Sequence, residues 1–189
     1  MLVGLMGQAQ SGKDSVALHL GEHGFKKMSF AAKLKQVCKE LFMFEDAQLE
    51  TTNGKAIIDP RYDLTPRTVL QKVGIFFREL YKDIWVDYLM SEIDGPDIKN
   101  WDGSYSNIVI TDVRFLNEVK AVKERNGVII RLIREDYQAL QGKEAQHASE
   151  TEQLNVPDEL IDLTVSAKTG ELEKLYKDVT DFLLKKAGR

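Results

Sequence analysis

Short apolar runs alternate with amphipathic stretches along most of the chain. The runs at residues 1–6, 25–30, 107–111, 128–133 and 163–166 have the length and composition of buried strands. Between them, apolar side chains recur at helical spacing and predict helices over 14–20, 34–42, 66–81, 115–125 and 170–186. Strands that alternate with helices predict an α/β fold with a mainly parallel sheet, built as a single domain over residues 1–189.

Two segments fit this alternation badly, about 45–93 and about 135–157. Residues 45–64 are polar and carry turn signals at Asn53-Gly54 and Asp59-Pro60. Thr65-Pro66 then has the form of an N-cap followed by proline at the first helical position, and 84–93 is rich in apolar residues. Residues 135–157 are polar and weakly periodic. Both segments are the best candidates for insertions that cover a substrate.

Composition narrows the functional classes. The 189 residues are 43% hydrophobic and 30% charged with a net charge of −4, so a core can form and a general nucleic-acid binder is not expected. The one cysteine, Cys38, excludes an internal disulfide, and its place on an apolar stripe predicts a core thiol. No apolar run approaches the roughly 18 residues of a membrane span, and no signal peptide is evident, so a cytoplasmic location is expected. The acidic C-terminal third and the 84–93 segment are compatible with a homodimer, but no interface is indicated.

The segment Gly7-Gln-Ala-Gln-Ser-Gly12-Lys13 matches the phosphate-binding pattern G-x-x-x-x-G-K, between a predicted strand and a predicted helix. Its glycines let backbone N–H groups turn toward phosphate oxygens, and Lys13 adds a positive charge. Asp14 stands where Ser or Thr usually binds Mg²⁺, with Ser15 one place later. The predicted ATP contacts in this segment are Gly7, Ala9, Gln10, Ser11, Gly12, Lys13, Asp14 and Ser15.

The predicted strand 107–111 runs directly into Asp112. Carboxyl ends of parallel strands line the ligand crevice, so Asp112 is expected there, where it would hold Mg²⁺ through water or orient a nucleophile. Asp14 is the second candidate for the metal, also through water. The alternative for Asp14 is an acid that favours the helix dipole. Arg114 follows two residues after Asp112 and either meets a phosphate or forms a surface ion pair.

On the helix that begins at Pro66, Arg67, Gln71, Gly74 and Arg78 fall within a sector of roughly 60°. Two arginines that flank an amide and a small residue are suited to a monophosphate and its base, because a guanidinium gives two parallel hydrogen bonds. An ordinary solvated face is the alternative. Glycine destabilises the middle of a helix, so Gly74 is expected either to leave room for a flat ring or to allow a close approach of backbone.

Arg131 and Arg134 flank the end of the 128–133 strand, ahead of the polar segment that contains His147 and Glu150. A polar flap that brings an arginine onto a transferring phosphoryl group also excludes water from it. Which of the two arginines takes that role stays open at this point.

Several stretches together resemble the phage-type deoxynucleoside monophosphate kinases. They are Gly12-Lys13-Asp14-Ser15, Ser29-Phe30-Ala31, Thr65-Pro66-Arg67, Thr111-Asp112-Val113-Arg114-Phe115 with Asn117-Glu118, and His147-Ala148-Ser149-Glu150. The resemblance implies a three-layer P-loop kinase fold with helices on both faces of the sheet, an acceptor-binding insertion at about 45–93 and a lid at about 135–157. It implies transfer of the ATP γ-phosphoryl group to a deoxynucleoside monophosphate with Mg²⁺.

The resemblance also assigns residues. Lys13, Asp112 and Arg134 would be catalytic, and Lys168, in the loop 167–170, would lie where such kinases cover the ATP base. The implied substrate-binding residues are Phe30, Lys35, Arg67, Gln71, Arg78, Trp85, Arg114, His147 and Glu150.

Two other activities are compatible with the sequence. A P-loop kinase resembling dephospho-coenzyme A kinase shares the phosphate loop and the core. A nucleotide-binding switch or ATPase would need no acceptor, and the arginine face and polar flap speak against it. The sequence does not indicate which bases are accepted.

Overall fold

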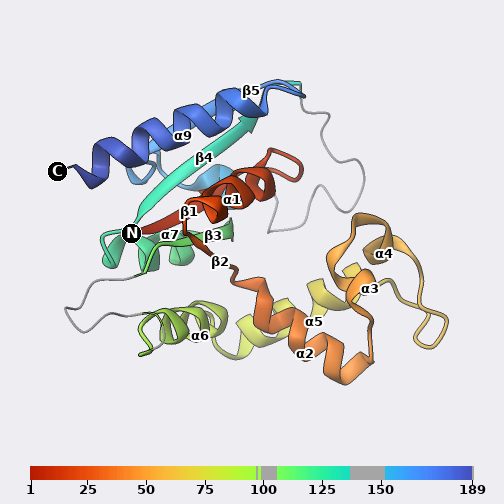
Figure 1. Ribbon diagram of the computed structural model, residues 1–189. Coiled ribbons are helices and arrows are strands. Elements are labelled where there is room, and N and C mark those ends of the chain that lie inside the picture. The colour runs from red at the N-terminus through yellow and green to blue at the C-terminus, as the bar shows by residue number, and fades with distance from the viewer. Residues whose placement is uncertain (97, 99–105, 137–151, 189) are drawn as a thin grey trace. The chain divides into compact units, whose positions relative to one another are not determined.

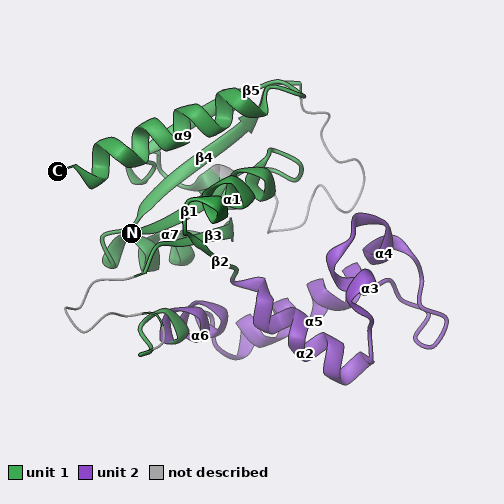
Figure 2. Ribbon diagram, in the orientation of Figure 1, with its two compact units in different colours: residues 1–29, 92–189 green, residues 30–91 purple. Residues whose placement is uncertain are grey.

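The computed structural model describes residues 1–96, 98, 106–136 and 152–188. The chain divides into two compact units, as Figure 2 shows. Unit 1 comprises residues 1–29 and 92–189, and unit 2 comprises residues 30–91. None of the helices in the described ranges combines the length and the apolar character needed to cross a membrane.

Unit 1 is built on a five-stranded parallel sheet (Figure 1). Its strands are β1 (Leu2–Met6), β2 (Lys26–Met28), β3 (Ile108–Val113), β4 (Val128–Arg134) and β5 (Leu163–Ala167), in the order β2-β3-β1-β4-β5. The central strand β1 pairs with β3 on one side and with β4 on the other. All pairings are parallel, so the carboxyl ends of the strands lie at one edge of the sheet.

Helices cover both faces of this sheet. Helices α1 (Lys13–Glu22) and α9 (Leu172–Ala187) pack on one face, where Val16, Leu20 and Val179 join the buried side chains of the strands. Helix α7 (Leu116–Glu124) lies on the other face, near Gly4 of β1, whose missing side chain leaves room for Ile129 and Val113. The short helices η2 (Glu152–Asn155) and η3 (Asp158–Leu160) precede β5. The predicted α/β class and parallel sheet are confirmed.

One strand boundary differs from the prediction in a way that matters for the site. The sequence predicts a strand that ends in Asp112, whereas β3 continues one residue further, to Val113. Val113 is fully buried and pairs with Met6, so the apolar contact extends the strand past the polar residue.

Unit 2 is helical. It contains α2 (Ala31–Phe42), α3 (Asp46–Glu50), α4 (Thr52–Ala56), α5 (Pro66–Leu80) and most of α6 (Ile84–Ile93). Its core gathers the buried side chains of Leu34, Cys38, Phe44, Leu49, Val69 and Trp85. Cys38 is a fully buried core thiol, as predicted.

The helix starts in unit 2 follow local chemistry. The Thr65 hydroxyl accepts a hydrogen bond from the Thr68 N–H at 3.1 Å, and Pro66 opens α5, which confirms the predicted start of that helix. The pattern predicts no helix in 45–64, whereas α3 and α4 lie there. The Thr51 hydroxyl caps α4 by accepting from the Gly54 N–H. Five-residue helices are too short to show an apolar period, so only their caps leave a signal in the sequence.

The compact helical unit begins at Phe30, about fifteen residues earlier than the segment 45–93 that the alternation marked as an insertion. The reason is the partner of α2. Its apolar stripe, with Leu34 and Cys38, packs into the helical core of unit 2. An amphipathic pattern predicts a buried face but does not identify the surface that covers it.

Candidate functional site

The segment from Gly7 to Gly12 forms a loop between β1 and α1, at the carboxyl edge of the sheet. Gly7 and Gly12 have φ angles of 149° and 94°, and Gln10 also has a positive φ of 61°. A β-carbon at Gly7 would lie only 2.4 Å from the Leu132 carbonyl oxygen and 2.6 Å from the Ser11 hydroxyl. Glycine at position 7 is therefore required by a close approach of backbone as well as by backbone conformation.

Helix α1 begins at this loop without a side-chain cap on its first turn. Gly12 is the N-cap residue and has no side chain that could accept a hydrogen bond from the first turn. The N-terminal N–H groups and the positive end of the helix dipole therefore face the loop, which is the arrangement that binds phosphate.

Lys13 lies inside the loop. Its ammonium group donates to the carbonyl oxygens of Gly7 at 2.7 Å and Gln8 at 2.6 Å, and it lies 3.4 Å from the Ser11 hydroxyl. The side chain is only 9% exposed. The loop carbonyls thus hold a positive charge at the position where phosphate oxygens would meet it. The structure brings together the predicted residues Gly7, Ala9, Gln10, Ser11, Gly12 and Lys13 in this one loop.

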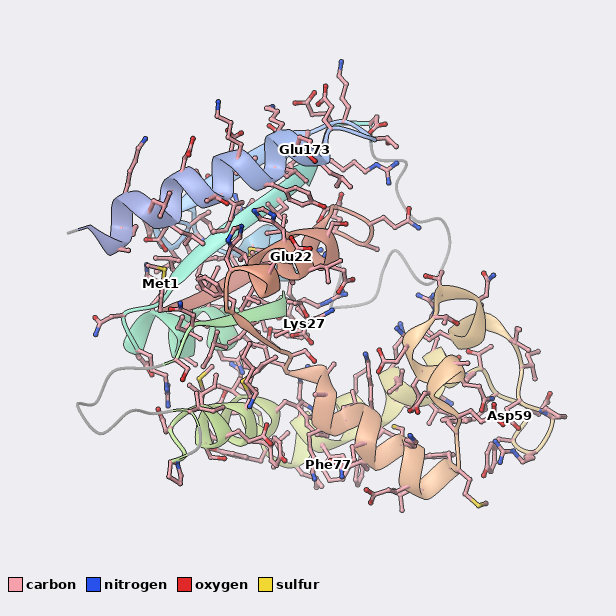
Figure 3. The ribbon with its side chains drawn as sticks, viewed as in Figure 1. Met1, Glu22, Lys27, Asp59, Phe77 and Glu173 are labelled. Carbon is pink, nitrogen blue, oxygen red and sulfur yellow. The ribbon has the colours of Figure 1, made fainter. Side chains whose placement is uncertain are left out.

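Asp14 follows Lys13 on the first turn of α1 and forms an ion pair with Lys27 of β2, with 2.7 Å between Nζ and Oδ1. Figure 3 labels Lys27 on its strand. Both side chains are exposed to solvent, at 84% for Asp14 and 53% for Lys27. An exposed pair of this kind contributes little to stability, so Asp14 can exchange Lys27 for another cation at small cost. Ser15, half-buried, is the next residue of the same turn.

Asp112 lies near the carboxyl end of β3, the strand beside β1. Met6, the last residue before the phosphate loop, pairs with Val113. The register therefore places Asp112 next to the start of the loop, as the strand pattern predicts. Its side chain is partly exposed.

Arg114 follows β3, and its backbone is fixed by Glu118 of α7. The Glu118 carboxylate accepts hydrogen bonds from the N–H groups of Arg114 at 2.7 Å and Phe115 at 3.1 Å. Glu118 is 2% exposed. A buried acid at the start of a helix, satisfied by two N–H groups, sets the path of the chain from β3 into α7.

The two arginines of β4 have different neighbours. Arg131 is held by Asp158, at 2.5 Å, and by the Val156 carbonyl oxygen. Arg134 reaches the phosphate loop, with its Nη1 3.5 Å from the Gln10 carbonyl oxygen. Arg134 also donates to Thr169, the neighbour of Lys168 in the turn that follows β5. Arg134 therefore lies beside Gln10 in the loop, whereas Arg131 pairs with Met6, at the start of the loop.

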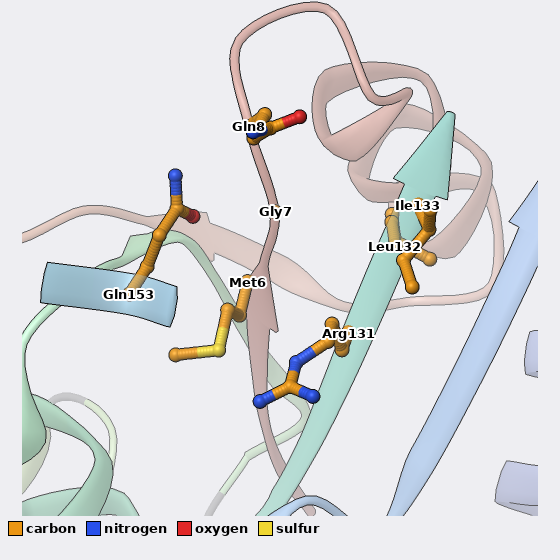
Figure 4. A pocket seen from close by; sticks show the side chains of 7 residues that line it. All are labelled: Met6, Gly7, Gln8, Arg131, Leu132, Ile133 and Gln153. Atoms are coloured by element: carbon orange, nitrogen blue, oxygen red, sulfur yellow. The ribbon is translucent and has the colours of Figure 1, made fainter. Parts of the chain in front are cut away.

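A pocket of about 230 Å³ borders the start of the phosphate loop (Figure 4). It is lined by the end of β1 and the first loop residues, by β4 and by η2, through Met6, Gly7, Gln8, Arg131, Leu132, Ile133 and Gln153. Ligand pockets usually measure roughly 300–1,000 Å³. This pocket is therefore suited to part of a ligand. Gln153 of this pocket is 3% exposed. It could not be recognised from the sequence, because its segment has no clear periodicity that would predict a buried side chain.

The remaining predicted residues belong to unit 2 or lie outside the described ranges. Arg67, Gln71 and Arg78 are partly exposed on α5, and Lys35 of α2 pairs with Glu50 at 2.6 Å. Phe30 is buried at the residue before α2. His147 and Glu150 lie outside the described residues, as does most of the predicted lid.

Trp85 and Gly74 have packing roles in unit 2. The Trp85 indole, 5% exposed, donates to the Gly74 carbonyl oxygen at 3.3 Å and lies against Phe77. A β-carbon at Gly74 would be 3.1 Å from the Leu34 side chain. Gly74 therefore leaves room for the Leu34 side chain of α2, rather than for a flat ring or a close approach of backbone. Trp85 belongs to the core, which corrects the expectation that its ring faces a substrate.

The carboxylates near the loop suit magnesium rather than a metal held by protein side chains alone. Within the described ranges, no three His, Cys, Asp or Glu side chains are grouped to hold a metal ion. Mg²⁺ typically keeps several waters and takes one or two carboxylates plus substrate phosphates. An exposed Asp14 beside the phosphate loop and Asp112 at the end of the neighbouring strand fit that mode of binding.

Comparisons with known proteins agree with this geometry. No family model matches the sequence. The chain is 37% identical over 143 residues to a protein of Acanthamoeba polyphaga mimivirus provisionally named deoxynucleotide monophosphate kinase, covering 71% of this chain and 74% of the relative.

Solved structures share the fold. Shikimate kinase from Acinetobacter baumannii superposes with a TM-score of 0.51 at 13% identity, over 98% of this chain and 93% of that one. A sugar kinase from Janibacter sp. superposes with a TM-score of 0.52 at 10% identity, over 96% and 93% of the two chains. At these identities the likeness concerns the fold alone.

Proposed function

Because this chain belongs to the deoxynucleotide monophosphate kinase family, we propose that it transfers the γ-phosphoryl group of ATP to a deoxynucleoside 5′-monophosphate. The products are ADP and a deoxynucleoside diphosphate. The observation that carries the proposal is the phosphate loop, with Lys13 held inside it at the start of an uncapped helix.

The chemistry follows from charge. An oxygen of the acceptor monophosphate attacks the γ-phosphorus in line, and the bond from that phosphorus to the β–γ bridging oxygen breaks as ADP leaves. Lys13 and the loop N–H groups stabilise the negative charge on the phosphoryl oxygens. The acceptor phosphate is already largely ionised near neutral pH, so no strong general base is needed.

Mg²⁺, when bound, neutralises charge between the β- and γ-phosphates. In this proposal Asp14 and Asp112 would hold the ion through water. Asp14 would exchange its exposed contact with Lys27 for this interaction. Arg134 supplies positive charge from the β4 side of the loop, where it already lies 3.5 Å from the Gln10 carbonyl oxygen.

Unit 2 is the proposed acceptor unit. Arg67, Gln71 and Arg78 share one face of α5, which suits a second phosphorylated ligand. Lys35 is proposed to contribute from α2, and Arg114 from the end of β3. The segment at about 135–157 is proposed as the lid.

The test is coupled measurement of ADP release with ATP and each deoxynucleoside or ribonucleoside monophosphate in turn. The expected result is turnover that depends on a deoxynucleoside monophosphate and falls by orders of magnitude in Lys13→Ala. ADP release that is independent of any added monophosphate would overturn the proposal. If ADP is released only with another acceptor, such as dephospho-coenzyme A, that compound and not a deoxynucleoside monophosphate is the substrate.

A separate pair of variants tests the proposed acceptor face, which is the face of α5 with Arg67, Gln71 and Arg78. Arg67→Ala is expected to raise the acceptor KM roughly ten- to a hundred-fold, the size of a lost charged hydrogen bond, with little change in the KM for ATP. Lys72→Ala removes a positive charge from the same helix on a different face and should leave both constants near those of the wild type. A response confined to the KM for ATP would contradict the placement of the acceptor on this face.

A further inference from the structure

Arg134 takes part in a hydrogen-bonded group with Asp136 and Thr169, which we call the Arg134 cluster. Arg134 Nε lies 3.0 Å from the Thr169 hydroxyl and 3.2 Å from Asp136 Oδ1, and Nη2 also donates to that hydroxyl. The Thr169 N–H donates to both carboxylate oxygens of Asp136, at 3.1 and 3.2 Å. The Thr169 hydroxyl makes a further hydrogen bond to Asp136 Oδ2.

Only one arrangement of protons is compatible with the hydrogen bonds of this cluster. A guanidinium only donates and an ionised carboxylate only accepts. The Thr169 hydroxyl must therefore accept from Arg134 and give its single proton to Asp136. The Thr169 hydroxyl and the Arg134 guanidinium keep the pKa of Asp136 below its ordinary value, so the carboxylate is charged at neutral pH.

Backbone contacts also bring the segments with Arg134, Asp136 and Thr169 close together, independently of these side chains. Arg134 pairs with Ala167 across β4 and β5, and the Glu135 N–H donates to the Ala167 carbonyl oxygen. Residues 135 and 136 form a turn directly after β4, and this turn places Asp136 beside Arg134. Two hydrogen bonds close the turn that contains Thr169. The Glu171 N–H donates to the Lys168 carbonyl oxygen, and the Lys168 N–H donates to the Glu171 carboxylate.

The cluster fixes where the guanidinium points. With Nε and Nη2 engaged by Thr169 and Asp136, the Nη1 atom is directed to the Gln10 carbonyl oxygen of the phosphate loop, 3.5 Å away. An arginine has several rotatable bonds that lose freedom when it binds, so a guanidinium held in advance binds an anion at lower entropic cost.

We propose that Asp136 and Thr169 are positioning residues that hold the Arg134 guanidinium at the phosphate loop, ready to bind the phosphoryl group that ATP transfers. This inference rests on the proposed phosphotransfer. It also links two parts of the nucleotide site, because the turn at 168–170, expected over the ATP base, carries the hydroxyl that holds Arg134.

The experiment compares Thr169→Val, which removes the hydroxyl but keeps the shape, with Thr169→Ser, which keeps the hydroxyl. Thr169→Val is expected to lower kcat about ten-fold and to weaken binding of a non-hydrolysable ATP analogue more than binding of ADP. Thr169→Ser should stay within about two-fold of the wild type. Equal behaviour of the two variants would overturn the inference.

A second pair of variants tests Asp136 and keeps the inference falsifiable if Thr169→Val does not fold. Asp136→Asn removes one negative charge with little change of size and should reproduce the loss in kcat. Glu173→Gln removes one negative charge from the exposed first turn of α9, labelled in Figure 3, and should change nothing. Thermal unfolding of each variant separates loss of fold from loss of positioning.

A double-mutant cycle separates positioning from a purely structural role. If Thr169 acts through Arg134, Thr169→Val has no further effect on kcat in an Arg134→Ala background. An equal further loss in that background would overturn the inference. If the wild type transfers phosphate to no monophosphate, the proposed function fails, while the ATP-over-ADP binding preference still tests whether the cluster positions Arg134.

Discussion

Gly7 offers a sharp quantitative test of the phosphate loop. In Gly7→Ala the new β-carbon would lie 2.4 Å from the Leu132 carbonyl oxygen, although real β-carbon contacts are essentially never below 3.0 Å. Leu132 belongs to β4, and β4 pairs with β1 up to Met6, so neither backbone can shift without disturbing the centre of the sheet. The φ angle of 149° adds backbone strain for any side chain.

The expected cost has two parts. Backbone strain at such a φ angle is about 1–3 kcal/mol, and overpacking adds about 1–3 kcal/mol. Gly7→Ala should therefore lower the free energy of unfolding by about 2–6 kcal/mol, a large part of the roughly 5–15 kcal/mol typical of a folded domain. Urea unfolding followed by circular dichroism measures this change, and titration with ADP measures the accompanying loss of nucleotide binding.

Two other glycines separate the contributions. Gly24 has a φ of 84° but open space where a β-carbon would lie, so Gly24→Ala should show strain without overlap, about 1–2 kcal/mol. Gly21 lies inside α1 with open space, and Gly21→Ala should stabilise the protein by about 0.5–1 kcal/mol. If Gly7→Ala is no more destabilising than Gly24→Ala, the close approach to Leu132 is not what requires glycine in the loop.

Three further predictions concern buried groups. Burial raises the pKa of the Cys38 thiol to about 11, so a disulfide reagent at pH 8 should label the protein only as fast as unit 2 opens, and immediate labelling of the folded protein would contradict the packing. Hydrogen bonds from Arg61 and Gln48 hold the pKa of Asp59 well below its usual range, so its contribution to stability is present above about pH 4 and is lost as the pH falls further. Asp59→Asn should therefore flatten the pH dependence of urea unfolding below about pH 4, and an unchanged slope would refute this. Glu118→Ala leaves two N–H groups without their buried acceptor and should cost about 2–4 kcal/mol in the free energy of unfolding, which a change below about 1 kcal/mol would contradict.

The phosphate loop was predictable because its determinants are contiguous. A buried strand, two glycines at fixed spacing, a lysine and a helix start all lie within residues 1–22, and each is a local property. The Thr65-Pro66 helix start was predictable for the same reason, since a cap involves residues three apart. The parallel sheet followed from the alternation of strands and helices.

The parts that sequence reasoning missed depend on distant residues. Asp136 and Thr169 are 33 positions apart, and neither carries a motif, although a carboxylate two residues after Arg134 was a usable signal. Arg131 lies against Asp158 and Arg134 lies beside Gln10, and no local pattern in the sequence connects either arginine to its neighbour. Trp85 was misplaced because an aromatic ring suits a core as well as a base, and only the tertiary packing distinguishes the two.

The central position of β1 has a consequence for how the chain folds. This strand is synthesised well before both of its neighbours, β3 and β4, which lie between residues 108 and 134. Unit 2, by contrast, is one continuous segment, and its core around Leu34, Cys38 and Trp85 lies within residues 30–91, so we expect it to begin folding while the rest of the chain is still being translated. The phosphate loop precedes β4 in the chain, but the contact between Gly7 and the Leu132 carbonyl group can form only after β4 has emerged from the ribosome. Nascent chains that end before β4 should therefore contain a folded helical unit and no nucleotide-binding loop.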